Sequence, residues 1–318
     1  MTTQKPQLPS WLHQSALAGV LWVTLWALSM LMTAAPYESV WFPATGITVV
    51  AMLLSGYRAI PGLSVAIIFT AFWGDFLFGI NTPLAVLLKG ALCALVTHIG
   101  VYWFFAAVYR FCIRRYAVLQ QNGSPLLLTI VFIAVALTGA FANAWLVLEV
   151  LSWAGLLDVG NQQALFWAWG FGDTVGILVV APICLTIAGS AYPRVKRYLG
   201  SMSFQNHPAD IRPVVTKAAV TFATLTSVLT LSFFSNSAGI AALLFLTLIP
   251  LFWIVLTESP SIAAITLAGL VILTTLFIDS FGLLMHELIY QSALIAMAVS
   301  TWLIIAVRAM GTEKAAKK

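Results

Sequence analysis

The most constraining feature of this chain is a carboxylate inside a stretch of membrane-spanning length. Residues 164–185 read ALFWAWGFGDTVGILVVAPICL and carry Asp173 near their middle. A charge at the centre of a transmembrane helix costs about 2.5–3.5 kcal/mol on insertion scales, so a helix that keeps one usually pairs it or uses it. Helical spacing places Trp169 on the Asp173 face. Gly172 and Gly176 form a small-xxx-small pair that allows another helix to approach closely.

Composition decides the class of protein. The chain is 61% hydrophobic and only 8% charged, whereas a soluble domain has about 25% charged residues. We therefore predict an all-α, polytopic bundle with lipid as its surroundings. The net charge of +5 does not indicate a nucleic-acid partner, because the basic residues lie in short loops between apolar runs and are better interpreted as orientation signals.

Hydropathy predicts ten spans, and eight full spans plus one hairpin are an alternative. The ten segments are 14–34, 41–57, 60–79, 84–109, 125–150, 164–189, 214–234, 238–256, 260–279 and 286–308. With a cytoplasmic N-terminus, every basic residue except Lys89 then falls on the inner side, as the positive-inside rule requires. The acidic residues expected on the outer side are Glu38, Glu149, Asp158, Asp279 and Glu287.

These assignments predict one integral membrane domain over residues 1–318. Residues 1–13 are expected to be cytoplasmic, residues 14–308 to form the bundle, and residues 309–318 to form a basic cytoplasmic tail. The second segment is a weak point: if it begins at Pro43, its roughly 15 residues rise only about 22 Å, less than a 30 Å hydrocarbon core. It is either a short helix sheltered by neighbours or a re-entrant segment.

Three charged residues share the outer half of the predicted bundle. Asp75 and Lys89 lie roughly 8 Å from the outer ends of their helices, and Asp173 lies about 14 Å down. Because each is unfavourable alone in lipid, we expect the three to meet in an outward-facing polar cavity, with Asn143 as a weaker candidate for the same network. The alternatives are an ion pair that only fixes helix register, and a Lys89 that snorkels to the interface.

Aromatic residues near the outer side have two interpretations. Trp41, Trp153 and Trp167 are typical of an aromatic belt at the headgroups, which we favour over a ligand cage. Trp169 is the exception, since it shares the Asp173 face. Pro43 suits the first turn of a helix, where its missing N–H removes no bond.

Other chemistry has little support. The four histidines lack metal-binding spacing, and neither a nucleophile elbow nor a phosphate-cradling glycine loop is present. Cys93, Cys112 and Cys184 show no paired spacing. We therefore expect no metal, no cofactor and no enzymatic activity.

Two ordered motifs carry a family resemblance. They are Trp41-Phe42-Pro43-Ala44-Thr45-Gly46, followed by Gly56-x-Arg58 and Pro61-Gly62, and Trp169-x-x-Gly172-Asp173-x-x-Gly176, followed by Ala181-Pro182 and Leu185. The set resembles the type-one membrane-associated sensor domain, the MASE family. Trp41, Pro43, Thr45 and Gly46 accordingly join the candidate site, and Gly172, Gly176 and Pro182 are assigned to helix packing.

The resemblance implies an input domain of a bacterial histidine kinase or GGDEF-type diguanylate cyclase in the inner membrane. Such proteins continue into a cytoplasmic signalling domain, so a chain ending after its last span is expected to be a stand-alone or shortened member. A cytoplasmic signalling partner, or a membrane partner, and a homodimer are also expected. Transport of a small solute or proton through Asp173 and Asp75 is the alternative function, and a purely structural role is the third.

Overall fold

The computed structural model describes residues 10–32, 40–119, 124–157, 162–192, 195 and 211–316, and every regular element in them is helical. Glu38 and Asp158 lie outside these ranges, as do six of the basic residues predicted on the inner side: Lys5, Arg194, Lys196, Arg197, Lys317 and Lys318. Their predicted sides of the membrane stay predictions. Residues 1–9 of the predicted cytoplasmic N-terminus also lie outside the described ranges.

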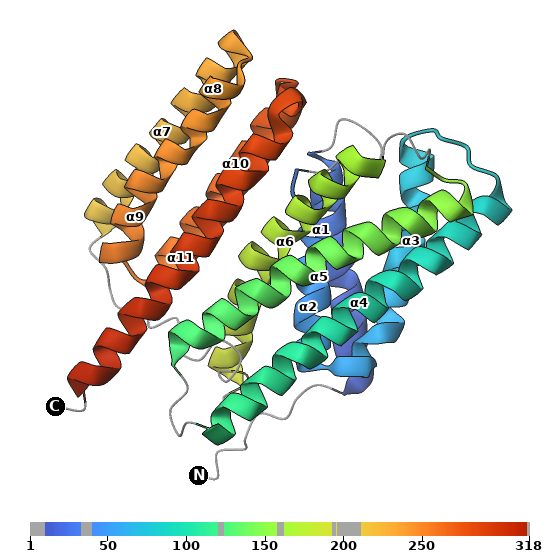
Figure 1. Cartoon of the computed structure of the whole chain (residues 1–318), viewed down its shortest axis with the longest axis horizontal. Helices are drawn as coiled ribbons and strands as arrows, with labels where there is room; N and C mark the ends of the chain where they lie inside the picture. Colours follow the sequence, from blue (N-terminus) through green and yellow to red (C-terminus); the bar gives the residue numbers. More distant parts are fainter. Residues whose placement is uncertain are drawn as a thin grey trace.

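The described residues up to Ala191 form six α-helices and one short 3-10 helix. These are α1 (Trp11–Met30), α2 (Ala44–Leu54), η1 (Gly56–Ala59), α3 (Ile60–Leu77), α4 (Leu84–Leu119), α5 (Pro125–Ala154) and α6 (Gln162–Ala191). They form one group in which α2 lies among α1, α4 and α6 (Figure 1). The short second helix is therefore sheltered by longer neighbours.

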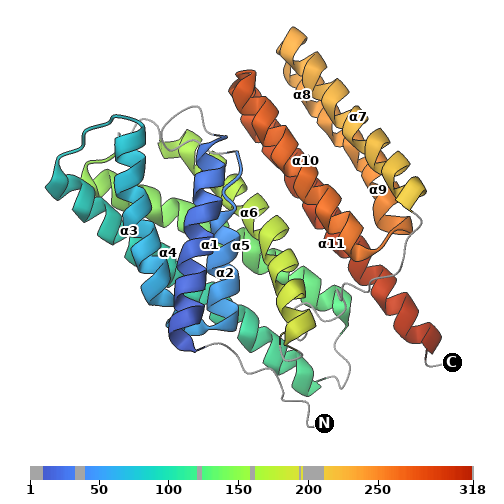
Figure 2. The same cartoon turned by 180° about the vertical axis from the view of Figure 1, so that it is seen from behind.

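The second half packs as a smaller group. It contains α7 (Ile211–Ser235), α8 (Ala238–Ala242), η4 (Leu243–Thr247), α9 (Leu248–Thr257), α10 (Pro260–Ser280), η5 (Leu283–His286) and α11 (Glu287–Ala316). Helix α11 packs against α5 and α6 as well as against α9 and α10, so it joins the two groups. Helix α1 begins and α11 ends at the same end of the bundle in both views (Figures 1 and 2).

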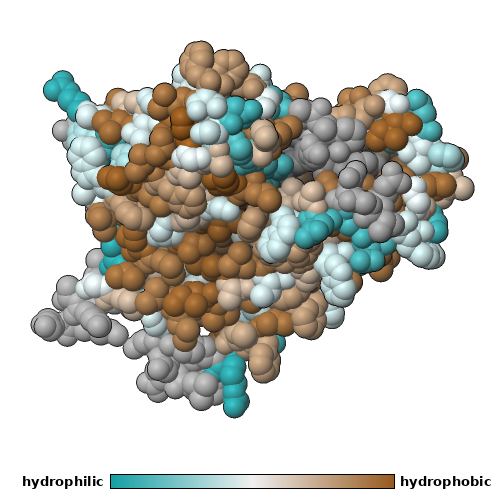
Figure 3. All heavy atoms as spheres, turned by 45° about the horizontal axis from the view of Figure 1, so that its top comes forward, coloured by the Kyte–Doolittle hydropathy of each residue, from teal (hydrophilic) through white to brown (hydrophobic). Residues whose placement is uncertain are grey.

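Nine helical segments within the described residues are long and apolar enough to cross a membrane. This confirms the predicted class, a polytopic helical membrane bundle. The predicted second span is the exception, because α2 has 11 residues and rises only about 16 Å. The segment Ala238–Thr257 reaches spanning length as three short pieces, α8, η4 and α9. Hydrophobic residues cover broad areas of the face that Figure 3 shows, as lipid contact requires.

Two arginines mark the end of the bundle where α2 and α9 terminate. Arg110 Nη1 of α4 donates to the Met52 carbonyl oxygen at 2.7 Å, and Arg308 Nη1 of α11 donates to the Glu258 carbonyl oxygen at 2.8 Å. The last carbonyls of a helix lack partners within it, and a cation there also suits the helix dipole. Both arginines belong to the set predicted on the inner side, so we call this end the inner end.

Candidate functional site

The start of α2 is pressed against α6 through two glycines. A Cβ atom built on Gly176 would lie 2.1 Å from the Phe42 carbonyl oxygen, and one built on Gly46 would lie 2.7 Å from the Gly176 carbonyl oxygen. The Phe42 N–H also donates to the Gly172 carbonyl oxygen at 3.2 Å. Only glycine at both positions permits this approach. The approach brings Thr45 of α2 to the side of α6 that carries Asp173.

Asp173 of α6 is the centre of a buried polar network. Its side chain is 6% exposed. Thr45 Oγ1 of α2 donates to Oδ1 at 2.7 Å, while Tyr102 Oη of α4 and Asn143 Nδ2 of α5 donate to Oδ2 at 2.8 and 2.9 Å. A carboxylate therefore has three donors from three different helices, the arrangement that a buried acceptor needs. Four helices are held together at this one side chain.

A second polar cluster lies beside the first. Trp22 Nε1 of α1 donates to Thr48 Oγ1 at 3.0 Å, and His98 Nε2 lies 3.1 Å from the same hydroxyl oxygen. The His98 ring also packs edge-on against the Tyr102 ring, with centroids 4.8 Å apart. Helix α1 is thereby connected to the carboxylate through α2 and α4.

A cavity of about 260 Å³ lies over the two clusters. It extends from Phe78 and Leu156, at the outer ends of α3 and α5, down to Asp173. Its polar lining includes Asp173, Asn143, His98 and Asp75, and most of the remaining lining is aromatic or aliphatic. A concave, mainly apolar site with a few convergent polar groups is the usual form of a small-molecule site.

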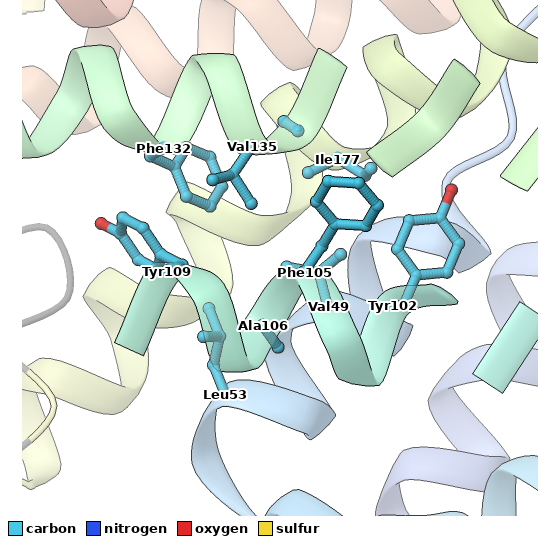
Figure 4. A pocket seen from close by; sticks show the side chains of 10 residues that line it. Val49, Leu53, Tyr102, Phe105, Ala106, Tyr109, Phe132, Val135 and Ile177 are labelled. Atoms are coloured by element: carbon cyan, nitrogen blue, oxygen red, sulfur yellow. The ribbon is translucent and has the colours of Figure 1, made fainter. Parts of the chain in front are cut away.

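The packing on the inner side of Asp173 is tight. A cavity of only about 10 Å³ lies there, between α2, α4, α5 and α6, which is room for about one water molecule. Figure 4 shows Tyr102, Phe105 and Tyr109 projecting from α4 with Phe132 and Val135 of α5 facing them. Tyr102 connects the two sites, since its hydroxyl donates to Asp173, which lines the large cavity, and Tyr102 itself lines the small one.

The predicted residues fall into two groups. Trp169 and Asp75 line the large cavity together with Asp173 and Asn143. Thr45 contacts Asp173 directly, whereas Pro43 and Gly46 serve the helix contact that carries it. Trp41 is buried together with Val40, which differs from the interface belt expected for it, because these two residues lie inside the bundle.

Lys89 departs from the expected meeting of three charges. Its Nζ donates to the Trp153 carbonyl oxygen at 3.1 Å and lies 3.6 Å from the centroid of the Trp153 ring. Among the described residues, the one ion pair joins Lys217 and Glu258, so Lys89 pairs with neither carboxylate. The physical reason is its shallow position, which lets the ammonium reach a helix-end carbonyl and an exposed indole.

The comparisons with known proteins agree with the motif pattern. The MASE1 family model matches residues 14–315, nearly the whole chain. The chain belongs to the MASE1 family. MASE1 is a membrane-associated sensor domain found in signalling proteins. Neither a curated protein nor a solved structure matches the chain.

Pro182 of this MASE1 domain produces a contact between α6 and α11. Proline has no N–H, so the carbonyl four residues earlier, that of Leu178, loses its helical partner. Trp302 Nε1 of α11 donates to that oxygen at 2.6 Å. The interior proline therefore creates an acceptor inside α6 that the last helix satisfies.

Replacing Trp302 with phenylalanine is expected to lower the free energy of unfolding by about 1 kcal/mol, the value of a typical interhelical hydrogen bond in a membrane. In a Pro182→Ala background the new N–H at position 182 satisfies Leu178 internally, so the same substitution should have less effect. A double-mutant cycle on unfolding in mixed micelles measures the difference. Equal losses in both backgrounds would contradict this origin of the contact.

A second contact ties α11 to the outer part of the MASE1 core. The buried Gln291 amide donates to the Ala168 carbonyl oxygen of α6 at 3.0 Å and to the Val40 carbonyl oxygen, just before α2, at 3.3 Å. Helix α11 is thus bonded to α6 on both sides of Asp173. It continues past Arg308 to Ala316 at the inner end.

Sequence reasoning missed two residues of the MASE1 domain that join helices, Tyr102 and Trp302. A signal for Tyr102 exists, because polar aromatic residues recur at positions 98, 102 and 109 on one face of α4. Only the acceptor of the Trp302 hydrogen bond could be predicted from the sequence, because a proline within an apolar helix leaves the carbonyl four residues earlier without its helical partner. The helix that supplies the donor is not readable from spacing.

Proposed function

We propose that this MASE1 domain receives a signal in the large outer cavity and relays it to a cytoplasmic output through α6 and α11. The single observation that carries the proposal is the Asp173 network, which joins α2, α4, α5 and α6 at the floor of that cavity. A molecule that contacts Asp173 adds a donor to this carboxylate and so changes the strength of the contacts that it makes with the other helices. In this proposal the bundle binds and relays, and carries out no reaction itself.

The contacts between α6 and α11 support the second half of the proposal. A shift of α6 would act on the Leu178–Trp302 and Ala168–Gln291 hydrogen bonds, and α11 leads toward the inner end. We further propose a bacterial cytoplasmic membrane, with a histidine kinase or diguanylate cyclase as the output partner. A homodimer fits this role because such outputs act as dimers in the family that the motifs resemble.

Transport through Asp173 and Asp75 remains the second candidate, favoured by a carboxylate that borders a large cavity. The tight packing on the inner side of Asp173 favours sensing instead. A deletion strain of the host, complemented with the wild type or with Asp173→Asn, tests the choice. Cellular cyclic-di-GMP and the phosphorylation of neighbouring response regulators are the two outputs to measure.

The expected result is a changed output in Asp173→Asn at a normal membrane level of the protein. Gly100→Ala is the matched control, because a Cβ at that exposed position meets nothing within 4 Å. Proton flux in reconstituted vesicles, read with an internal pH dye, is measured in parallel. Flux that depends on Asp173 with an unchanged output would support transport. A lower Tm with neither effect would support a structural role.

A further inference from the structure

The lining of the large cavity is anionic and aromatic. Among the described residues that line it, the charged side chains are Asp173 and Asp75, and none is a lysine or an arginine. The nearby Lys89 interacts instead with Trp153. In a site of low dielectric, two carboxylates without a lining cation attract positive charge strongly.

The aromatic side chains of the lining suit the same kind of ligand. Trp22, Trp26, Phe42, Phe78 and Trp169 all border the cavity. The faces of aromatic rings attract ammonium groups, and a cage of several rings is a common way to bind them. Aromatic rings also accept the apolar part of an amphiphilic molecule.

Asp173 has capacity for one more donor. Each carboxylate oxygen accepts about two hydrogen bonds. Oδ2 already accepts two, from Tyr102 and Asn143, but Oδ1 accepts one, from Thr45. An ammonium N–H directed at Oδ1 therefore fills the remaining hydrogen-bond position of that oxygen without displacing a helix contact.

Cavity volume limits the size of the molecule. An apolar cavity of about 150 Å³ holds benzene, so the observed 260 Å³ holds a ligand of roughly ten non-hydrogen atoms. We propose that the cavity binds a small amphiphilic monoamine, with its ammonium group on Asp173 and its apolar part among the tryptophans. The proposal rests on the proposed function, since it names the ligand class of that site.

The test is isothermal titration of the purified full chain in dodecylmaltoside micelles with phenethylamine as the probe. Its matched isosteres are 2-phenylethanol, which is neutral, and phenylacetate, which is anionic. The expected result is that the amine binds at least about tenfold more tightly than either isostere, as one charge-assisted hydrogen bond supplies. Equal affinity for the amine and the alcohol would overturn the proposal.

Two variants locate the ammonium. Asp173→Asn is expected to weaken amine binding at least about tenfold and Asp75→Asn about threefold, with little change for the alcohol. Gly100→Ala is the control and should bind like the wild type. If Asp173→Asn does not fold, the amine-to-alcohol affinity ratio in Asp75→Asn decides, and an unchanged ratio would overturn the assignment.

Membrane lipids with ethanolamine headgroups carry the same ammonium chemistry. Titrations in nanodiscs of phosphatidylglycerol, with and without phosphatidylethanolamine, separate the two sources. Weaker amine binding in the presence of phosphatidylethanolamine supports the lipid headgroup as the source, and unchanged binding supports a free amine. Failure of the amine to bind, together with a changed cellular output in Asp173→Asn, would reject the ligand class and leave the sensory proposal intact.

Discussion

Replacing Asp173 with leucine is expected to lower the free energy of unfolding by about 2–5 kcal/mol. The substitution removes three interhelical hydrogen bonds, each worth roughly 0.6–1.7 kcal/mol in a membrane, and leaves the Thr45, Tyr102 and Asn143 donors buried without their acceptor. The measurement is reversible unfolding in mixed micelles, followed by circular dichroism.

The matched control is Thr186→Val on the same helix. The Thr186 hydroxyl donates at 2.7 Å to the Pro182 carbonyl oxygen within α6, and it bonds to no other helix in the described part of the chain. Its loss should therefore change the stability by less than about 1 kcal/mol. If Asp173→Leu is as stable as this control, the carboxylate does not hold the four helices together.

Replacing Gly176 with alanine is expected to destabilise the fold by about 3 kcal/mol, at the upper end of the range for overpacking. The new Cβ would lie 2.1 Å from the Phe42 carbonyl oxygen. That oxygen is a backbone atom, so a side-chain rotation cannot relieve the clash. Helix α2 must therefore separate from α6, which lengthens the Thr45–Asp173 contact as well. Thermal unfolding of the purified chain measures the loss.

The control for this change is Gly100→Ala on α4, which should be neutral or slightly stabilising because alanine favours the helix more than glycine does. A second prediction distinguishes helix separation from general strain. Thr45→Val should have little further effect in the Gly176→Ala background, since its hydrogen bond is already lost. Full additivity of the two substitutions would contradict the separation of α2 from α6.

Much of the fold was predictable because lipid permits few structures. Apolar length and the positions of basic residues predicted the class and the succession of helices. Helix ends were less predictable: α4 continues to Leu119 and α11 to Ala316, beyond the apolar windows. Hydropathy reports the part of a helix that suits lipid, and these helices continue past it. The break of α8 and α9 at Leu243–Thr247 has no comparable signal, because all the residues there suit an apolar helix.

The candidate site was predictable at its centre and less so at its edges. A carboxylate in an apolar helix requires partners, and two of its three donors, Asn143 and Thr45, were among the predicted site residues. Tyr102 was missed because an apolar helix contains many aromatic residues and spacing does not show which hydroxyl faces a neighbour. Lys89 was grouped with the carboxylates by its depth and by the cost of a lone charge in lipid, but neither specifies the direction of a side chain around its helix.

The most direct measurement of the central claim is a double-mutant cycle between Tyr102→Phe and Asp173→Asn, followed by reversible unfolding. The account predicts a coupling free energy of about 0.6–1.7 kcal/mol, because each substitution removes the same contact between α4 and α6. Strict additivity would mean that the hydroxyl and the carboxylate do not interact in the membrane-embedded protein, and would contradict the network on which the proposed function depends.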